Sequence, residues 1–238
     1  LGSAVNHLFQ RVDRFDLQVR EVLAEWFAFH LSNFAYVWPW QSWSVVLELE
    51  QAAPQRMFVT DVLANCVRLS FWERIQNTVP DDFLLLMPHQ PNPAFRFSEK
   101  NSQNADPDTQ IYFQAAGALL AVLKARSPAE SISAWLEQQI TPKLGPEARL
   151  RIFVPCLLEM GNKSYSHIAA LIEKYKSVFS SLITDADSQR LIVHSIGEYW
   201  QHSHQHIIII IDKFLGASIV EPAAIVNWIF SQHQAFVK

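Results

Sequence analysis

Hydrophobic residues recur along most of the chain at the spacing of one helix face. Stripes at intervals of three and four residues run through positions 19–27, 58–69, 111–122, 168–182, 191–199 and 225–230. An α-helix has 3.6 residues per turn, so these intervals gather apolar side chains on one side. The pattern predicts a succession of amphipathic helices. In the first of them it predicts a buried face formed by Val19, Val22, Leu23, Trp26 and Phe27.

Helix boundary signals agree with this prediction. Ser164 and Asp185 precede helical stripes and suit the N-cap position, where a side-chain oxygen accepts a backbone N–H. Pro128 and Pro222 suit a first helical turn, whose N–H groups have no partner within the helix. The scarcity of glycine, six residues in all, disfavours hairpins and sheets.

Residues 207–211 are five consecutive isoleucines, a composition typical of a strand. They lie between two amphipathic segments, where a turn that is apolar on all sides fits a buried helix. We therefore favour a helix over a strand for this run.

Prolines at positions 80, 88, 91, 93 and 107 interrupt the helical pattern, and residues 98–109 are mostly polar. Proline removes a backbone donor and stops helices, so this region predicts a linker or a long surface loop. We expect residues 1–90 and 110–238 to form two helical units joined by residues 91–109. The rhythm of helix after helix predicts an all-α fold of stacked antiparallel helix pairs, a HEAT-like or armadillo-type repeat.

Composition and charge narrow the function classes. Half of the 238 residues are hydrophobic, which excludes disorder. The net charge of −4 divides into −4 for residues 1–90, −1 for 91–109 and +1 for 110–238, with no basic block. A surface that binds phosphates directly needs clustered Lys and Arg, so contact with RNA is expected only through a partner or a small patch. No run of about 18 apolar residues predicts a membrane span.

The best candidate for a metal site is a histidine cluster. His202, His204 and His206 alternate along the chain, with His194 one or two turns earlier, and His202 and His206 are four residues apart. Zinc needs three or four converging ligands, and no carboxylate or cysteine is spaced to complete this set. A polar helix start or loop is the favoured alternative to a metal-dependent enzyme centred here.

Other catalytic signals are missing from the sequence. Cys66 and Cys156 sit in apolar helical stretches and have the character of reduced core residues. Neither a Gly-x-Ser-x-Gly elbow, a P-loop nor a Gly-x-Gly-x-x-Gly motif occurs. We expect no enzymatic activity, no catalytic residue and no cofactor.

Five aromatic residues gather around Pro39: Phe34, Tyr36, Trp38, Trp40 and Trp43. Such a cluster can stack on a nucleobase or a methylated cap if two parallel rings are exposed. It can equally fill the core at a corner between helices. The second interpretation is favoured, and Trp38, Trp40, Trp43 and Trp228 are then fold-defining aromatics. Asn227 is expected in the core with them.

Several blocks, in a fixed order along the chain, resemble the large subunits of nuclear cap-binding complexes. The most specific are the first and the last, because tryptophan and asparagine at fixed spacing rarely recur by chance. The blocks are His30-Leu31-Ser32-Asn33-Phe34, Trp38-x-Trp40-x-x-Trp43, Arg68-Leu69-Ser70, Val79-Pro80, Lys163-Ser164-Tyr165-Ser166-His167, Ile219-Val220 and Val226-Asn227-Trp228-Ile229-Phe230. The resemblance covers about residues 5–230.

The resemblance implies a fold and a function. That family has three helical domains, each similar to the middle domain of translation initiation factor four-gamma. This chain corresponds to the end of the second domain, the linker and the first part of the third. The family's complex binds the 7-methylguanosine cap of nuclear transcripts. Aromatics of a small RRM-type subunit stack on the cap, while the large subunit holds the small one and docks splicing, export and decay factors. Location in the nucleus with shuttling is implied, and enzymatic activity is not.

The resemblance also indicates one candidate site. Phe95-Arg96-Phe97 corresponds to an aromatic-basic-aromatic run in the linker of family members. An arginine between aromatics suits recognition of a partner's acidic peptide. The alternative is an ordinary loop anchored by two rings. Residues 141–146 form a short proline-bearing turn where relatives carry a longer acidic insertion. A generic helical scaffold of translation or RNA decay remains the alternative function.

Overall fold

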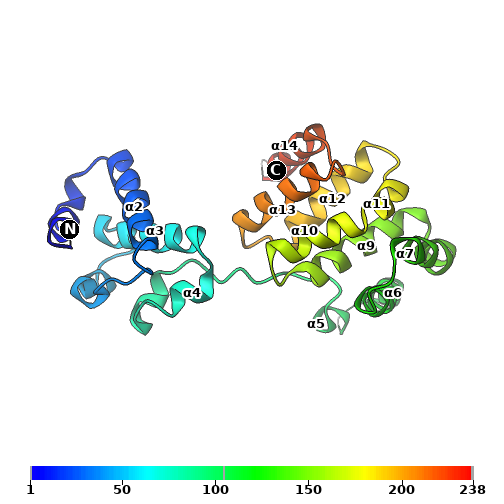
Figure 1. Cartoon of the computed structure of the whole chain (residues 1–238), viewed down its shortest axis with the longest axis horizontal. Helices are drawn as coiled ribbons and strands as arrows, with labels where there is room; N and C mark the ends of the chain where they lie inside the picture. The colour runs from blue at the N-terminus through cyan, green and yellow to red at the C-terminus, as the bar shows by residue number, and fades with distance from the viewer. Residues whose placement is uncertain (1, 104, 237–238) are drawn as a thin grey trace. The chain divides into compact units, whose positions relative to one another are not determined.

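The computed structural model describes residues 2–103 and 105–236, with side chains up to residue 231, and this part of the chain contains helices and no strand (Figure 1). The expectation of an all-α fold is confirmed. Backbone contacts divide the chain into two compact units, residues 1–90 and 91–238. No helix within the described residues is long and apolar enough to cross a membrane.

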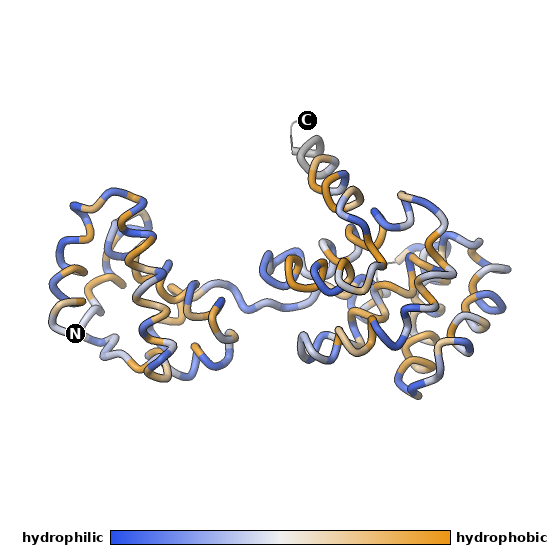
Figure 2. Tube along the Cα trace, turned by 45° about the horizontal axis from the view of Figure 1, so that its top comes forward, coloured by the Kyte–Doolittle hydropathy of each residue, from blue (hydrophilic) through white to orange (hydrophobic). Residues whose placement is uncertain are grey.

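The first unit is built around two long helices. Helix α2 packs most extensively against α3, and the shorter elements close the same core. The elements are α1 (Gly2–Phe9), η1 (Val12–Arg14), α2 (Leu17–Ser32), η2 (Trp40–Leu47), α3 (Pro54–Leu69), α4 (Trp72–Gln76) and η3 (Asp81–Leu86). In Figure 2 apolar and polar positions alternate along the turns of the helices, as expected for helices with one buried face.

The second unit surrounds one central helix, α9, which contacts α6, α10 and α12 (Figure 1). Ten of its residues are buried. The elements are α5 (Glu99–Ser102), α6 (Pro107–Lys124), α7 (Ala129–Trp135), the π-helical turn η4 (Leu136–Ile140), α8 (Thr141–Leu144), α9 (Pro146–Gly161), α10 (Tyr165–Lys174), α11 (Lys176–Leu182), α12 (Ala186–Tyr199), α13 (His204–Gly216) and α14 (Pro222–Phe236).

Most of the predicted boundaries hold. Ser164 caps α10 by accepting from the N–H of His167 at 3.1 Å, and Asp185 caps α12 by accepting from the N–H of Ser188 at 2.7 Å. The isoleucine run lies inside α13. Pro128 is the residue before α7 rather than part of its first turn.

The region expected to be a short turn near residues 141–146 contains a helical turn, α8. This turn ends at Gly145, whose φ of 84° is a left-handed conformation that favours glycine. The chain can therefore reverse from α8 into α9 at one residue.

The predicted buried face of α2 is partly wrong. Val19, Val22 and Trp26 are 51%, 59% and 43% exposed. The buried positions are instead Ala24, Phe27, Ala28 and Leu31. Helix α2 carries apolar residues on two faces, and the face with two alanines lets α3 approach closely, so periodicity alone selects the wrong stripe.

A close contact between helices fixes α14 on α12. Gly197 is buried, and a Cβ atom at this position would lie 2.4 Å from Cζ2 of Trp228. Nothing described lies within 4 Å of a Cβ placed at Gly117 in α6.

We expect Gly197→Ala to lower the free energy of unfolding by about 1–3 kcal/mol through overpacking. Gly117→Ala should instead raise it by up to about 1 kcal/mol through helix propensity. Urea denaturation followed by circular dichroism measures both, and equal effects would contradict this packing.

The Asp185 cap makes a pH-dependent contribution to stability. Hydrogen bonds from the N–H and hydroxyl of Ser188 lower the pKa of the Asp185 carboxyl below its ordinary 3.8. A carboxyl whose pKa is lower in the folded state stabilises the fold at neutral pH, and this stabilisation is lost as the pH falls through the folded pKa. We expect Asp185→Ala to lower the melting temperature at pH 7, with a gap from wild type that narrows in acid. Asp185→Asn, which keeps the cap, is the control, and a gap that does not vary with pH would contradict the assignment.

Candidate partner-binding grooves

The segment around Phe95-Arg96-Phe97 is held against the second unit. The N–H of Ala94 donates to the carbonyl of Tyr199 at 2.7 Å. Phe95 and Phe97 are half-buried and pack on the core of this unit, with their ring centroids 5.9 Å apart in an edge-to-face arrangement. Phe97 also meets Phe113 of α6 edge to face at 5.6 Å. The two rings therefore anchor the segment that the sequence marked as a candidate site.

Arg96 lies between one ring of this anchor and an acid of α12. Its guanidinium carbon lies 5.6 Å from the ring centroid of Phe97, a cation–π contact. One guanidinium nitrogen lies 3.6 Å from a carboxylate oxygen of Glu198, and both side chains are close to half exposed. Exposed pairs of this length contribute about 0–1 kcal/mol, so Arg96 is free to exchange Glu198 for another anion.

A groove of about 1020 Å³ opens beside this segment. One side is the chain from Pro93 to Asn101, and the other is the exposed face of α6 with Leu120 and Lys124. Glu159 of α9 and the region at the end of α12 complete it. We call this the linker groove. All of its lining residues belong to the second unit.

Tyr199 joins the groove to the core beneath it. Its side chain is 2% exposed, and its hydroxyl donates to a carboxylate oxygen of Glu159 at 2.6 Å. The side-chain amide of Asn162 donates to the same hydroxyl at 3.1 Å. Burial raises the pKa of Tyr199, and the adjacent Glu159 raises it further, so the phenol keeps its proton as a donor. The sequence predicts Tyr199 on an apolar helix face but does not indicate its place beside the groove, because its partners Glu159 and Asn162 are distant along the chain.

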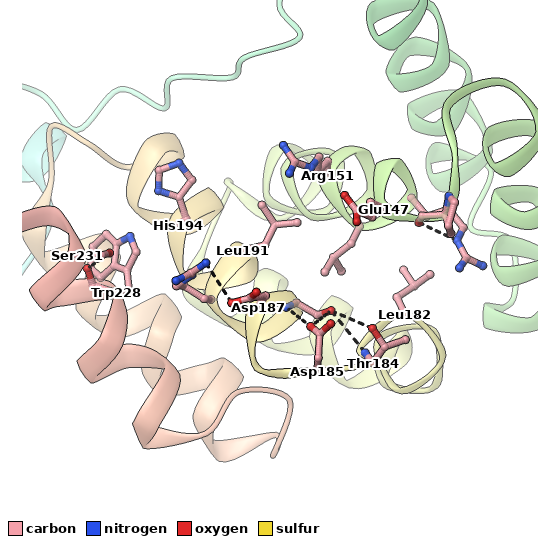
Figure 3. Close-up of a pocket in the computed structure, with 15 residues that line it drawn as sticks. Glu147, Arg151, Leu182, Thr184, Asp185, Asp187, Leu191, His194, Trp228 and Ser231 are labelled. Atoms are coloured by element: carbon pink, nitrogen blue, oxygen red, sulfur yellow. Dashed lines mark hydrogen bonds and ion pairs between the residues drawn. The ribbon is translucent and has the colours of Figure 1, made fainter. Parts of the chain in front are cut away.

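A second groove, of about 760 Å³, lies on another part of the same unit (Figure 3). Figure 3 shows Glu147 and Arg151 of α9, Leu191 of α12, and Trp228 and Ser231 of α14 around it. We call this the α9–α14 groove.

The charges of the α9–α14 groove are largely compensated within the unit. Arg149 pairs with Glu137, and Arg190 pairs with Asp187 at 3.0 Å. Asp185 is engaged as the α12 cap. The charges left over on the neighbouring turns, Glu147 and Arg151, have opposite signs and cancel. This groove therefore has no charge preference for a ligand.

The histidine cluster has other contacts. The ring of His206 stacks on Trp200 at 4.1 Å and lies 5.1 Å from Tyr165, and its Nδ1 is 2.8 Å from the hydroxyl of Ser203. His202 and His204 are exposed. In the described part of the chain, no three His, Cys, Asp or Glu side chains converge to hold a metal ion.

Both cysteines are buried and free. Burial raises the pKa of the Cys66 thiol to about 12 and raises the pKa of Cys156 as well. A cysteine nucleophile acts as the thiolate, so neither residue has the electrostatic environment of a catalytic cysteine.

The aromatic cluster fills the core of the first unit. Trp43 stacks on Phe9 with ring centroids 4.2 Å apart, and its indole N–H donates to the side-chain oxygen of Asn6 at 2.7 Å. Trp40 is also buried, Trp38 is half-buried, and Phe34 alone among the five is exposed. The cluster presents no pair of exposed parallel rings for a cap.

At the other end of the chain, Trp228 is half-buried against α12. The expectation for Asn227 is wrong, because its side chain is exposed.

Comparison with known proteins identifies the relatives of this chain. A family profile described as MIF4G like matches residues 101–237, and a second with the same description matches residues 1–81. Proteins named nuclear cap-binding protein subunit 1 are 34% identical in Arabidopsis thaliana, 34% in Oryza sativa subsp. japonica and 31% in Aedes aegypti. The matches cover 97%, 96% and 98% of this chain but 27%, 26% and 29% of those proteins. The chain thus spans little more than a quarter of their length, and the resemblance inferred from the sequence is confirmed.

The anchoring by Phe95 and Phe97 predicts a measurable protection of the segment. Trypsin requires a locally opened chain, so we expect the anchored segment to be protected from cleavage after Arg96 and Lys100. We expect the double variant Phe95→Ala/Phe97→Ala to be cut there at least several-fold faster, with unchanged helical content. Phe230→Ala removes a ring that is 64% exposed and is the matched control. Cleavage at the same rate in both variants would show that the rings do not hold the segment.

Proposed function

The chain belongs to the MIF4G-like family, and on that premise we propose that it is part of a non-enzymatic scaffold subunit of a nuclear mRNA cap-binding complex. The observation that supports this most directly is similarity along the whole chain to three proteins named nuclear cap-binding protein subunit 1. The place of action is then the nucleus, with shuttling to the cytoplasm.

Residues 1–90 are proposed as the C-terminal part of one helical-repeat domain and residues 110–238 as the N-terminal part of the next, with 91–109 as the linker. The two separate hydrophobic cores support this division, as do the family matches that end at 81 and resume at 101. The linker is not a free tether in this proposal, since Phe95 and Phe97 pack on the second core. The first-unit tryptophans Trp38, Trp40 and Trp43, and Trp228 in the second, define the two folds.

The partners are a small RRM-type subunit, with which the chain forms a heterodimer, and RNA-processing and export factors. Capped RNA is contacted through the small subunit, in keeping with the absence of a basic block in the sequence. The scaffold acts by ordering mobile parts of the small subunit. Less ordering then remains when the cap binds, so cap affinity rises without a cap contact from this chain.

The linker groove is proposed as a docking site for a protein partner, with Phe95, Arg96 and Phe97 as the contact residues. Two half-buried rings and an exposed arginine are the residue types that contribute most to protein interfaces. In the alternative the rings only anchor the segment, and Arg96 serves only its contacts with Phe97 and Glu198.

Fluorescence titration with a 7-methylguanosine cap analogue tests the scaffold function. This chain, the small RRM-type subunit and their mixture are titrated in parallel, with unmethylated guanosine triphosphate as the control ligand. We expect binding that depends on the methyl group to be at least tenfold tighter in the mixture than in either component alone.

Equal affinity of the mixture and the small subunit would contradict the proposal that residues 1–238 are sufficient to order the cap site. Copurification of the two proteins without a gain in affinity would reduce the role to tethering. If they do not associate at all, the result would favour a generic helical scaffold of translation or RNA decay.

A further inference from the structure

The charges of the linker groove are unevenly compensated. Glu159 accepts a hydrogen bond from the Tyr199 hydroxyl. The carboxylate oxygens of Glu198 lie 3.6 Å from a guanidinium nitrogen of Arg96 and 3.5 Å from Nε2 of His194. Lys100 and Lys124 also line the groove, and within the described residues neither side chain has a hydrogen-bond or ion-pair partner. Two of the three acids of the groove are thus engaged, whereas two of its three cations are free. Glu99, exposed at one edge, is the remaining free acid.

The floor between these cations is apolar and unobstructed. Gly117 and Ala121 lie one turn apart on the exposed face of α6, and Leu120 lies beside them. Among the described residues, no atom outside the adjacent helix backbone and the two chain neighbours is within 4 Å of a Cβ placed at Gly117, so the surface there is open to a ligand backbone. Phe95 and Phe97 form the opposite wall. An extended segment can lie along this floor with apolar side chains toward the rings and charged ones toward the lysines.

We propose that the linker groove binds an acidic linear segment of a protein partner. Lys100, Lys124 and Arg96 pair with its carboxylates, and an aromatic or aliphatic residue between them contacts Phe95 and Phe97. Arg96 exchanges Glu198 for a ligand carboxylate, and Glu198 keeps His194 as a neighbour. This inference rests on the proposed docking role of the groove and specifies the chemistry of its partner.

The same cations are less suited to RNA. Three cations stand among three acids in this groove, whereas a phosphate backbone requires a surface of one sign along its length. Carboxylates spaced along a peptide can face the two free lysines and avoid Glu99. The test must therefore distinguish binding of an acidic peptide from binding of a nucleic acid.

Fluorescence anisotropy with three labelled probes tests the inference. Two are peptides of equal length with the same central phenylalanine, flanked by glutamates in one and by glutamines in the other. The third is a uridine oligonucleotide of similar length. We expect the glutamate peptide to bind at least tenfold tighter than the glutamine peptide and the oligonucleotide, and to weaken as salt rises.

Charge reversal locates the site. The variant Lys100→Glu/Lys124→Glu should weaken glutamate-peptide binding at least tenfold. The matched control Lys163→Glu/Lys176→Glu changes two exposed lysines outside the groove and should stay within twofold of wild type. Gly117→Trp fills the floor and should weaken binding, whereas Gly117→Ala should have a small effect. Circular dichroism verifies that each variant is folded.

The outcomes separate this inference from the docking role. If both peptides bind equally and Phe95→Ala/Phe97→Ala weakens both, the groove docks proteins but does not select acidic ones. If neither peptide binds, or if the oligonucleotide binds tightest, the inference is overturned. The cap titration does not use this groove. If the peptide experiment fails, the scaffold proposal still stands. If the cap titration fails, the proposal of an acidic ligand for the linker groove still stands.

Discussion

The burial of α9 is the constraint on which the second unit depends. Ten of its residues are buried, and α6, α10 and α12 pack around it, so no face of this helix remains free to choose other neighbours. Burying this much apolar surface is the main favourable term in folding such a domain. Because α9 is fixed, its exposed ends are fixed too. Its first turns contribute Glu147 and Arg151 to one groove, and its last turn contributes Glu159 to the other.

Compensation of charge distinguishes the two grooves more than their size does. In the α9–α14 groove arginines and acids of the same unit neutralise one another, and a ligand must compete with those pairs. In the linker groove Glu159 and Glu198 are engaged from within, by Tyr199, His194 and Arg96, and two lysines are left over beside one free acid, Glu99. A partner therefore gains ion pairs there without displacing strong internal ones. Both grooves contain cations and acids, but the cations of the α9–α14 groove are arginines, whereas those of the linker groove include two lysines without a partner among the described residues.

The segment that connects the two units is also a wall of the linker groove. Its Ala94 N–H and two rings attach it to the second core, and Tyr199 links that attachment to Glu159. A partner bound in the groove thus contacts both the linker and the helices behind it.

Sequence periodicity by itself determined the all-α class, the caps at Ser164 and Asp185, and the helical state of the isoleucine run, because these depend on neighbours within a few residues. Spaced tryptophan and asparagine blocks determined the family. Which face of α2 is buried was decided only by tertiary structure, since both faces are apolar and the alanine-bearing face packs closer.

The linker groove was only partly predicted from the sequence: Phe95, Arg96 and Phe97 were identified through the family pattern. Lys124, Glu159 and Tyr199 reach the same place from positions up to about a hundred residues away. No local sequence pattern predicts that these residues lie together, because the packing of α6, α9 and α12 around one core brings them there.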